Sequence, residues 1–118
     1  MKAMPIHDGA FTVLVAHECK PAESERFALE RVDHIEQRMR RHAGFLSSLV
    51  YLSDDATRVF ELLQWARAGD WEAYRDSEDG RRAALSPPGR GPAVHGLEMV
   101  GAALPSPPGR DPPDAKLP

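Results

Sequence analysis

The chain has 118 residues, of which 42% are hydrophobic and 28% are charged, and its formal net charge is -3. These values are typical of one soluble globular domain, and the lack of a Lys and Arg stripe argues against nucleic acid as a partner. No segment approaches the roughly 18 apolar residues that cross a membrane, and the first residues lack the apolar core of a signal peptide. A cytoplasmic protein without a membrane partner is therefore expected.

Residues 10–19 are predicted to form the first strand. Apolar side chains occupy both of its faces, which is typical of a central strand. Residues 22–42 are predicted to form a long helix that ends at Gly44, with acidic residues near its start and basic residues near its end. His34 lies off the apolar stripe of this helix and is expected at the surface. The stripe comprises Ala28, Val32, Ile35 and Met39.

Two further strands, residues 45–53 and 58–66, are predicted to form a hairpin around a polar turn. A short helix is expected over residues 71–76, with Asp70 as its N-cap. Gly80 is expected to interrupt this helical region. The elements expected after it are a turn of helix over residues 81–85 and a last strand over residues 93–104.

The chain divides into a lead of residues 1–9, a domain of residues 10–104 and a Pro-rich tail of residues 105–118 that is expected to be disordered. The order β-α-β-β-α-β predicts an α+β ferredoxin-like fold with an antiparallel sheet. Two helices cover only one face of such a sheet, but the third strand has apolar residues on both faces, with Phe60 and Leu62 on one of them. The uncovered face is predicted to pack against a second copy, giving a homodimeric α+β barrel.

Four segments of the domain resemble the antibiotic biosynthesis monooxygenase family, a branch of the dimeric α+β barrels. They read FTVLVAHECKPAE, RHAGFLSSLVYLS, FELLQW and DWEAY. The resemblance implies a dimer with a pocket in each subunit between sheet and helices. It also implies several activities, because some members turn an anthrone or naphthol into a quinone with O2 and no cofactor, others degrade heme, and others have no known reaction.

The positions that the heme-degrading members use are changed in this chain. Those members have an Asn in the first strand, a Trp in the second helix and a heme-ligating His after it. The corresponding residues here are Val15, Tyr74 and, approximately, Ala83. The resemblance therefore disfavours heme degradation.

The quinone-forming members are matched in part. Their Trp at the end of the third strand corresponds to Trp65, and their later Arg corresponds loosely to Arg81 or Arg82. Their Asn four residues before the Trp is Glu61 here, and their Tyr six residues after it is Trp71. The match supports the position of the pocket better than it supports the reaction.

Three residues are candidates for handling a proton: Glu61, His17 and Tyr74. Glu61 lies on the same strand face as Trp65, where desolvation would raise the pKa of its carboxyl and make it a base near neutral pH. Alternatively, this face opens to solvent or an Arg pairs with Glu61. His17 is the second candidate, because imidazole is the usual proton carrier near neutral pH; the alternative is a satisfied histidine at a strand end.

Aromatic residues are the candidates for binding a flat substrate. Trp65 is suited to stack on a polycyclic ligand, or else packs in the core. Trp71 and Tyr74 share a helix face, from which the Tyr74 hydroxyl reaches a phenol or carbonyl, unless it too is a core residue. Arg81 and Arg82 are adjacent, so at least one faces solvent. The predicted site comprises Trp65, Glu61 and His17 as catalytic residues and Trp71, Tyr74, Arg82 and Tyr51 as substrate-binding residues.

The function that these features favour is a cofactor-independent monooxygenase. Its substrate would be an aromatic polyketide of the anthrone or naphthol type, which it would oxidise to a quinone with O2. Two alternatives remain open: a polyketide cyclase or isomerase on the same fold, and a non-catalytic barrel that binds a small molecule. No metal is expected, because the histidines share no ligand spacing and Cys19 is the single cysteine.

Overall fold

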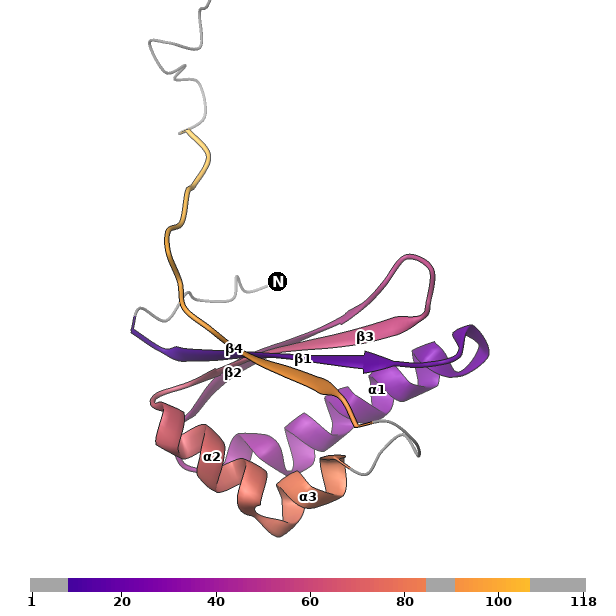
Figure 1. The fold of residues 1–118 in the computed structure, drawn as a ribbon, viewed down its shortest axis with the longest axis horizontal. Coiled ribbons are helices and arrows are strands. Elements are labelled where there is room, and N and C mark those ends of the chain that lie inside the picture. The colour runs from indigo at the N-terminus through magenta and orange to yellow at the C-terminus, as the bar shows by residue number, and fades with distance from the viewer. Residues whose placement is uncertain (1–8, 85–90, 107–118) are drawn as a thin grey trace, which may run out of the picture.

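The computed structural model of the chain describes residues 9–84 and 91–106. It contains one antiparallel four-stranded sheet with the strand order β2-β3-β1-β4, and its helices cover one face of the sheet (Figure 1). This arrangement confirms the predicted α+β ferredoxin-like fold. The elements are β1 (Phe11–Glu18), α1 (Pro21–Gln37), the 3-10 helix η1 (Met39–Arg41), β2 (Phe45–Leu52), β3 (Arg58–Trp65), α2 (Ala68–Asp76), α3 (Glu78–Ala84) and β4 (Ala93–Leu97).

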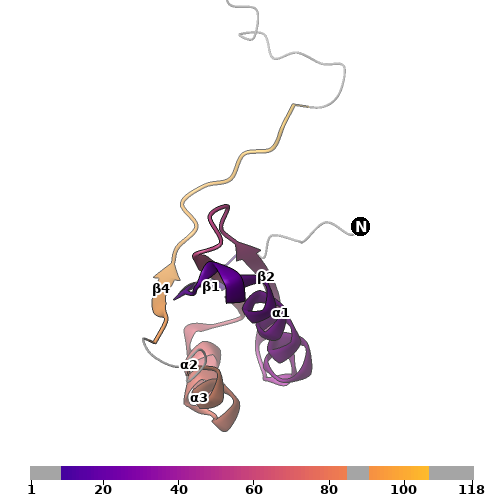
Figure 2. The same cartoon turned by 90° about the vertical axis from the view of Figure 1, so that its right-hand side faces the viewer.

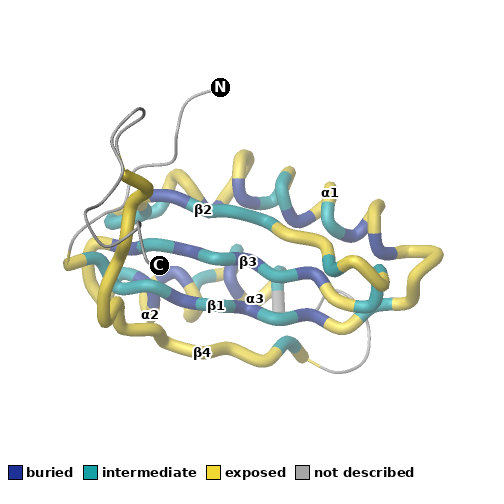
Figure 3. Tube along the Cα trace, turned by 90° about the horizontal axis from the view of Figure 1, so that it is seen from above, coloured by how far each residue is buried: buried dark blue, intermediate teal, exposed yellow. Residues whose placement is uncertain are grey.

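Strand β1 is central, as its two apolar faces predicted. Val15 lies opposite Glu61 of β3 on one side and opposite Val94 of β4 on the other. Buried and half-buried residues alternate along β1 and β3 (Figure 3), because successive side chains point to opposite faces of a sheet. The helix-facing side chains of these two strands therefore form one continuous surface beneath the helices.

Strand β4 is shorter than the expected strand over residues 93–104. It ends at Leu97, which pairs with Thr12 near the start of β1. Beyond this point β1 offers almost no backbone for pairing, and residues 98–106 extend away from the sheet (Figures 1 and 2). Most of the predicted lead and most of the predicted tail lie outside the described residues.

Helix α1 differs from its prediction in length and in rotation. It ends at Gln37, and η1 follows, so the expected continuous helix to residue 42 is wrong. The buried positions of α1 are Ser24, Phe27, Arg31 and Ile35. The helix is turned so that a charged residue, Arg31, lies where the apolar stripe placed Ala28 and Val32.

The α2–α3 region also corrects two expectations. Arg67 is the N-cap of α2, and Asp70 lies inside the first turn with its carboxylate against Gly44. Gly80 does not interrupt the helical region but lies within α3. A Cβ at Gly80 would come 2.2 Å from the carbonyl oxygen of Tyr74, so the missing side chain lets α3 pack directly on the end of α2.

No described element covers the other face of the sheet (Figure 2). Its side chains, apart from the buried Ser47, are half-buried or exposed and mostly apolar, and they come from all four strands. Pairing in the sheet places Leu49, Leu62 and Leu14 in one row across β2, β3 and β1. We refer below to this surface as the open face.

Candidate active site

A cavity of about 300 Å³ lies between the helix-facing side of the sheet and helices α2 and α3. Its apolar wall includes Val15, Leu63 and Trp71, and Gly91, Pro92 and Val94 also line it. Its polar wall contains His17, Arg31, Glu61 and Tyr74. A small apolar chamber with a few convergent polar groups is the usual form of a small-molecule site.

Glu61 is the centre of the polar wall. It is 1% exposed, and the two residues that contact its carboxylate, His17 and Arg31, are 2% and 6% exposed. Arg31 donates from Nε to Oε2 and from Nη2 to Oε1, both over 3.1 Å. His17 donates from Nε2 to Oε2. The fork-like guanidinium contact and the imidazole together satisfy a carboxylate that would otherwise be costly to bury.

The pKa of Glu61 is shifted in the direction opposite to the one expected from the sequence. Burial alone would raise it, but the hydrogen bond from His17 and the charge and hydrogen bonds of Arg31 outweigh burial and hold the pKa of this carboxyl below its usual value. The structure therefore contains the alternative in which an Arg pairs with Glu61. The side chain of Glu61 is an ionised carboxylate at neutral pH.

His17 is oriented by this carboxylate. Because Nε2 donates to Glu61, Nδ1 is the nitrogen left for another partner, and it has none among the described residues although it is buried. The ring edge of Phe27 holds the imidazole from the helix side, with centroids 5.0 Å apart. His17 lines both the cavity and a wider surface groove of about 980 Å³, so it lies between the cavity and solvent.

The aromatic residues form a stack behind the cavity. Trp65 is fully buried and stacks on Tyr74, with centroids 5.5 Å apart and an interplanar angle of 29°. Trp71 is tilted against both, at 6.1 Å from Trp65 and 5.9 Å from Tyr74. Trp71 and Tyr74 line the cavity, whereas Trp65 supports them from the core. The Nε1 of Trp65 is buried without a partner among the described residues.

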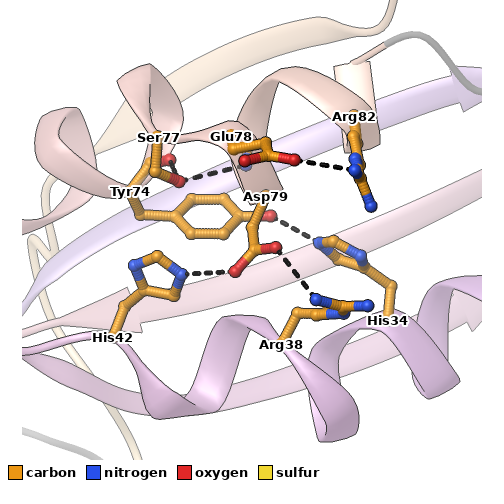
Figure 4. A network of polar contacts seen from close by, with 9 residues as sticks. His34, Arg38, His42, Tyr74, Ser77, Glu78, Asp79 and Arg82 are labelled. Atoms are coloured by element: carbon orange, nitrogen blue, oxygen red, sulfur yellow. Dashed lines mark hydrogen bonds and ion pairs between the residues drawn. The ribbon is translucent and has the colours of Figure 1, made fainter.

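The hydroxyl of Tyr74 contacts a residue that was expected at the surface. It lies 2.7 Å from Nε2 of His34, which is half-buried (Figure 4). Next to this pair, Asp79 accepts a hydrogen bond from His42 and pairs with Arg38. The expectation that His34 lies at the surface holds only in part, because α2 packs over this side of α1 and brings a polar partner to it.

Two residues of the predicted site lie elsewhere. Arg82 is exposed on α3 and pairs with Glu78 over 2.7 Å, and its neighbour Arg81 is exposed as well. Tyr51 is 53% exposed and belongs to the open face. The cationic residues at the cavity are instead Arg31 and, at its rim, Arg75.

Arg31 and His34 are the residues that the sequence pattern did not reveal as part of the site. Arg31 had a signal, because it lies four residues after Phe27 and four before Ile35, which is the spacing of one helix face. Its charge placed it with the solvent-facing residues. His34 had no such signal, since its contact comes from α2.

The described residues contain no group of three or more His, Cys, Asp or Glu side chains arranged to hold a metal ion. No helix in the described part of the chain is long and apolar enough to cross a membrane.

Solved structures confirm the fold. A monooxygenase from the gene ActVA-Orf6 of Streptomyces coelicolor, in complex with the ligand nanaomycin D, is 27% identical, with 82% of this chain and 93% of that chain covered and a TM-score of 0.69. Rv0793 from Mycobacterium tuberculosis is 16% identical, with 80% and 99% covered and a TM-score of 0.65. A protein described as an antibiotic biosynthesis monooxygenase is 14% identical, with 77% and 99% covered and a TM-score of 0.64. No family model and no curated protein matches the sequence.

Proposed function

The chain resembles the antibiotic biosynthesis monooxygenases and shares their fold, and we propose that it is a cofactor-independent monooxygenase. Its substrate is an aromatic polyketide of the anthrone or naphthol type, which it oxidises to a quinone with O2. The observation that carries the proposal is the aromatic-walled cavity in which a buried carboxylate orients His17. The nanaomycin D complex of the Streptomyces coelicolor monooxygenase adds support from a relative.

The reaction needs a base and a place for O2 but no external electron donor. The activated CH2 of an anthrone gives one proton to Nδ1 of His17, and the resulting carbanion transfers an electron to O2. The two radicals combine to a peroxide anion, which takes up a proton. Loss of the second C–H proton and cleavage of the O–O bond then give C=O and water. The substrate supplies all four electrons that O2 accepts, so one oxygen atom ends in the quinone and one in water.

His17 is the base in this proposal, and Glu61 is the residue that positions it. A carboxylate with a lowered pKa is a weak base, and both oxygens of Glu61 are occupied. The same carboxylate fixes the Nε2–H form of the imidazole and stabilises the imidazolium that forms when Nδ1 takes a proton. Arg31 and the imidazolium then share the single carboxylate of Glu61.

The cavity favours a compact substrate. Its volume of about 300 Å³ is at the lower end of the roughly 300–1,000 Å³ typical of ligand sites. Trp71 and Tyr74 provide flat surfaces against an aromatic ring. A substrate with two or three fused rings is therefore expected to bind better than a larger polycycle.

The first test is oxygen-dependent turnover of dithranol, a dihydroxyanthrone, followed by quinone absorbance. We expect quinone formation above the spontaneous rate in air and none without O2. Trp71→Ala removes a wall of the cavity and is expected to lower kcat/KM at least about 10-fold, as one buried aromatic contact is worth about 1.5 kcal/mol or more. Glu72→Ala, on the exposed side of the same helix, is the matched control.

A cyclase or isomerase is the second candidate, because the pairing of His17 with Glu61 suits proton transfer in general. Such an enzyme converts its substrate equally well with and without O2. Binding of dithranol with no O2-dependent turnover would therefore reject the oxygenase and favour this alternative, or a non-catalytic binding protein.

The proposed enzyme is a cytoplasmic homodimer that buries its open face. Leu62, in the middle of this face on the inner strand β3, is expected to lie at the interface. Leu62→Lys should therefore convert a dimer into a monomer, measured by sedimentation equilibrium. Leu29→Lys makes the same change on the exposed side of α1 and should leave the mass unchanged. A wild-type chain that sediments as a monomer would contradict this proposal.

A further inference from the structure

We propose that Tyr74 and His34 form a proton relay that connects the cavity with a separate surface groove between α1 and α3. The inference rests on the proposed function, since it assigns the acid that complements the base His17. Tyr74 lines the cavity, and His34 lines the groove, which has a volume of about 710 Å³. The hydrogen bond of 2.7 Å between the Tyr74 hydroxyl and Nε2 of His34 joins the two spaces (Figure 4).

Packing contacts hold the rings of Tyr74 and His34 in place. Tyr74 is 3% exposed, and it is fixed by the stack with Trp65 and by the edge of His42, whose centroid lies 5.0 Å away. His34 is on α1, one turn after Arg31, and meets the Tyr74 ring at its hydroxyl end. A relay needs donors and acceptors that keep their geometry, and this contact is built from two packed helices.

The protonation states also suit a relay. Burial raises the pKa of the Tyr74 hydroxyl, so it remains a donor. Burial and the charge of Arg31 lower the pKa of His34, and Arg38 acts in the same direction while Glu61 and Asp79 oppose it. A neutral imidazole can give a proton from one nitrogen while it takes one at the other. The remaining charged groups at the groove are Glu30, Asp33, Arg41 and His42.

The chemistry of the peroxide step uses this path. The Tyr74 hydroxyl gives its proton to the peroxide anion, Nε2–H of His34 restores the hydroxyl, and Nδ1 of His34 takes a proton from water in the groove. The proton removed by His17 leaves separately through the wider groove that His17 lines. One proton enters and one leaves, so the overall reaction remains balanced.

The relay predicts a specific pattern of turnover. Tyr74→Phe and His34→Ala are each expected to lower kcat for dithranol by about 10- to 100-fold, and the double variant no further than the worse single one, because both remove the same path. Imidazole added to His34→Ala should restore activity through the open groove, which a purely structural role would not allow. Asp33→Asn, an exposed groove residue beside His34, is the control.

A second measurement does not depend on turnover. NMR titration of the His34 ring is expected to shift when dihydroxyanthraquinone binds in the cavity, and Tyr74→Phe should abolish that shift. A shift without oxidase activity in the wild type would reject the proposed oxygenase and retain the relay. An unchanged His34 titration, or wild-type kcat in both single variants, would overturn the relay.

Discussion

Replacing Arg31 with Met is expected to destabilise the protein by about 3–5 kcal/mol at pH 8, since removal of one partner leaves a buried charge without compensation. The guanidinium of Arg31 provides two of the hydrogen bonds to the carboxylate of Glu61, which is 1% exposed. Urea unfolding measures the change. Arg26→Met, an exposed position of the same helix, should cost under about 1 kcal/mol.

The pH dependence of this cost has a defined sign. In the wild type, the pKa of Glu61 is lower in the folded state, so its contribution is present above the unfolded pKa and is lost as the pH falls through the folded value. Without Arg31, burial is expected to raise the folded pKa of Glu61 above its unfolded value. The variant then gains stability relative to the wild type as the pH falls from 8 to 5. A difference in the free energy of unfolding that stays constant over this pH range would contradict this account.

A second substitution tests whether the cost comes from the lone charge. Glu61→Leu added to Arg31→Met removes both charges, and the double variant is expected to be more stable than Arg31→Met alone. His17 loses its acceptor in the double variant, so recovery of the full wild-type stability is not expected. A double variant no more stable than Arg31→Met would show that the lone carboxylate of Glu61 is not the source of the cost.

The largest expected effect on activity comes from His17→Gln. General-base catalysis contributes about 10²- to 10⁴-fold, so kcat for dithranol should fall at least about 100-fold. Binding, measured by quenching of tryptophan fluorescence, should change only a few-fold because the aromatic wall is intact. The variant thus separates proton removal from substrate binding.

His95→Gln is the matched control for this experiment. His95 is exposed on β4 and lies opposite Leu14, on the open face, so it does not reach the cavity. It should retain wild-type kcat. If His17→Gln also retains kcat within about threefold while the protein remains folded, His17 is not the base, and the proposed mechanism is wrong.

Alternation and helical spacing were enough to predict the fold. The apolar faces of residues 10–19 predicted a central strand, and the hairpin and the order of elements were found as expected. Strand patterns also predicted that Glu61 lies on the same face as Trp65, because residues an even number of positions apart on a strand point to the same side. The residue at which the last strand ends was predicted wrongly, because β4 stops pairing where its partner β1 begins.

The polar part of the site depends on contacts between elements, which local patterns do not contain. Arg31 is buried because Glu61 lies beneath it, and neither residue alone indicates the other. The direction of the Glu61 pKa follows from that contact and was therefore predicted with the wrong sign. His34 meets Tyr74 only because of the angle at which α2 packs beside α1.

The two walls of the cavity come from different parts of the chain, and this has an evolutionary consequence. The proposed base His17 and the two residues that position it, Glu61 and Arg31, belong to β1, β3 and α1, which form the main body of the fold. The opposite wall comes from α2, α3 and the residues Gly91, Pro92 and Val94. Mutations in that second wall, other than at Tyr74, can therefore change which molecule fits while the chemistry persists, so close relatives can diverge in substrate before they diverge in reaction.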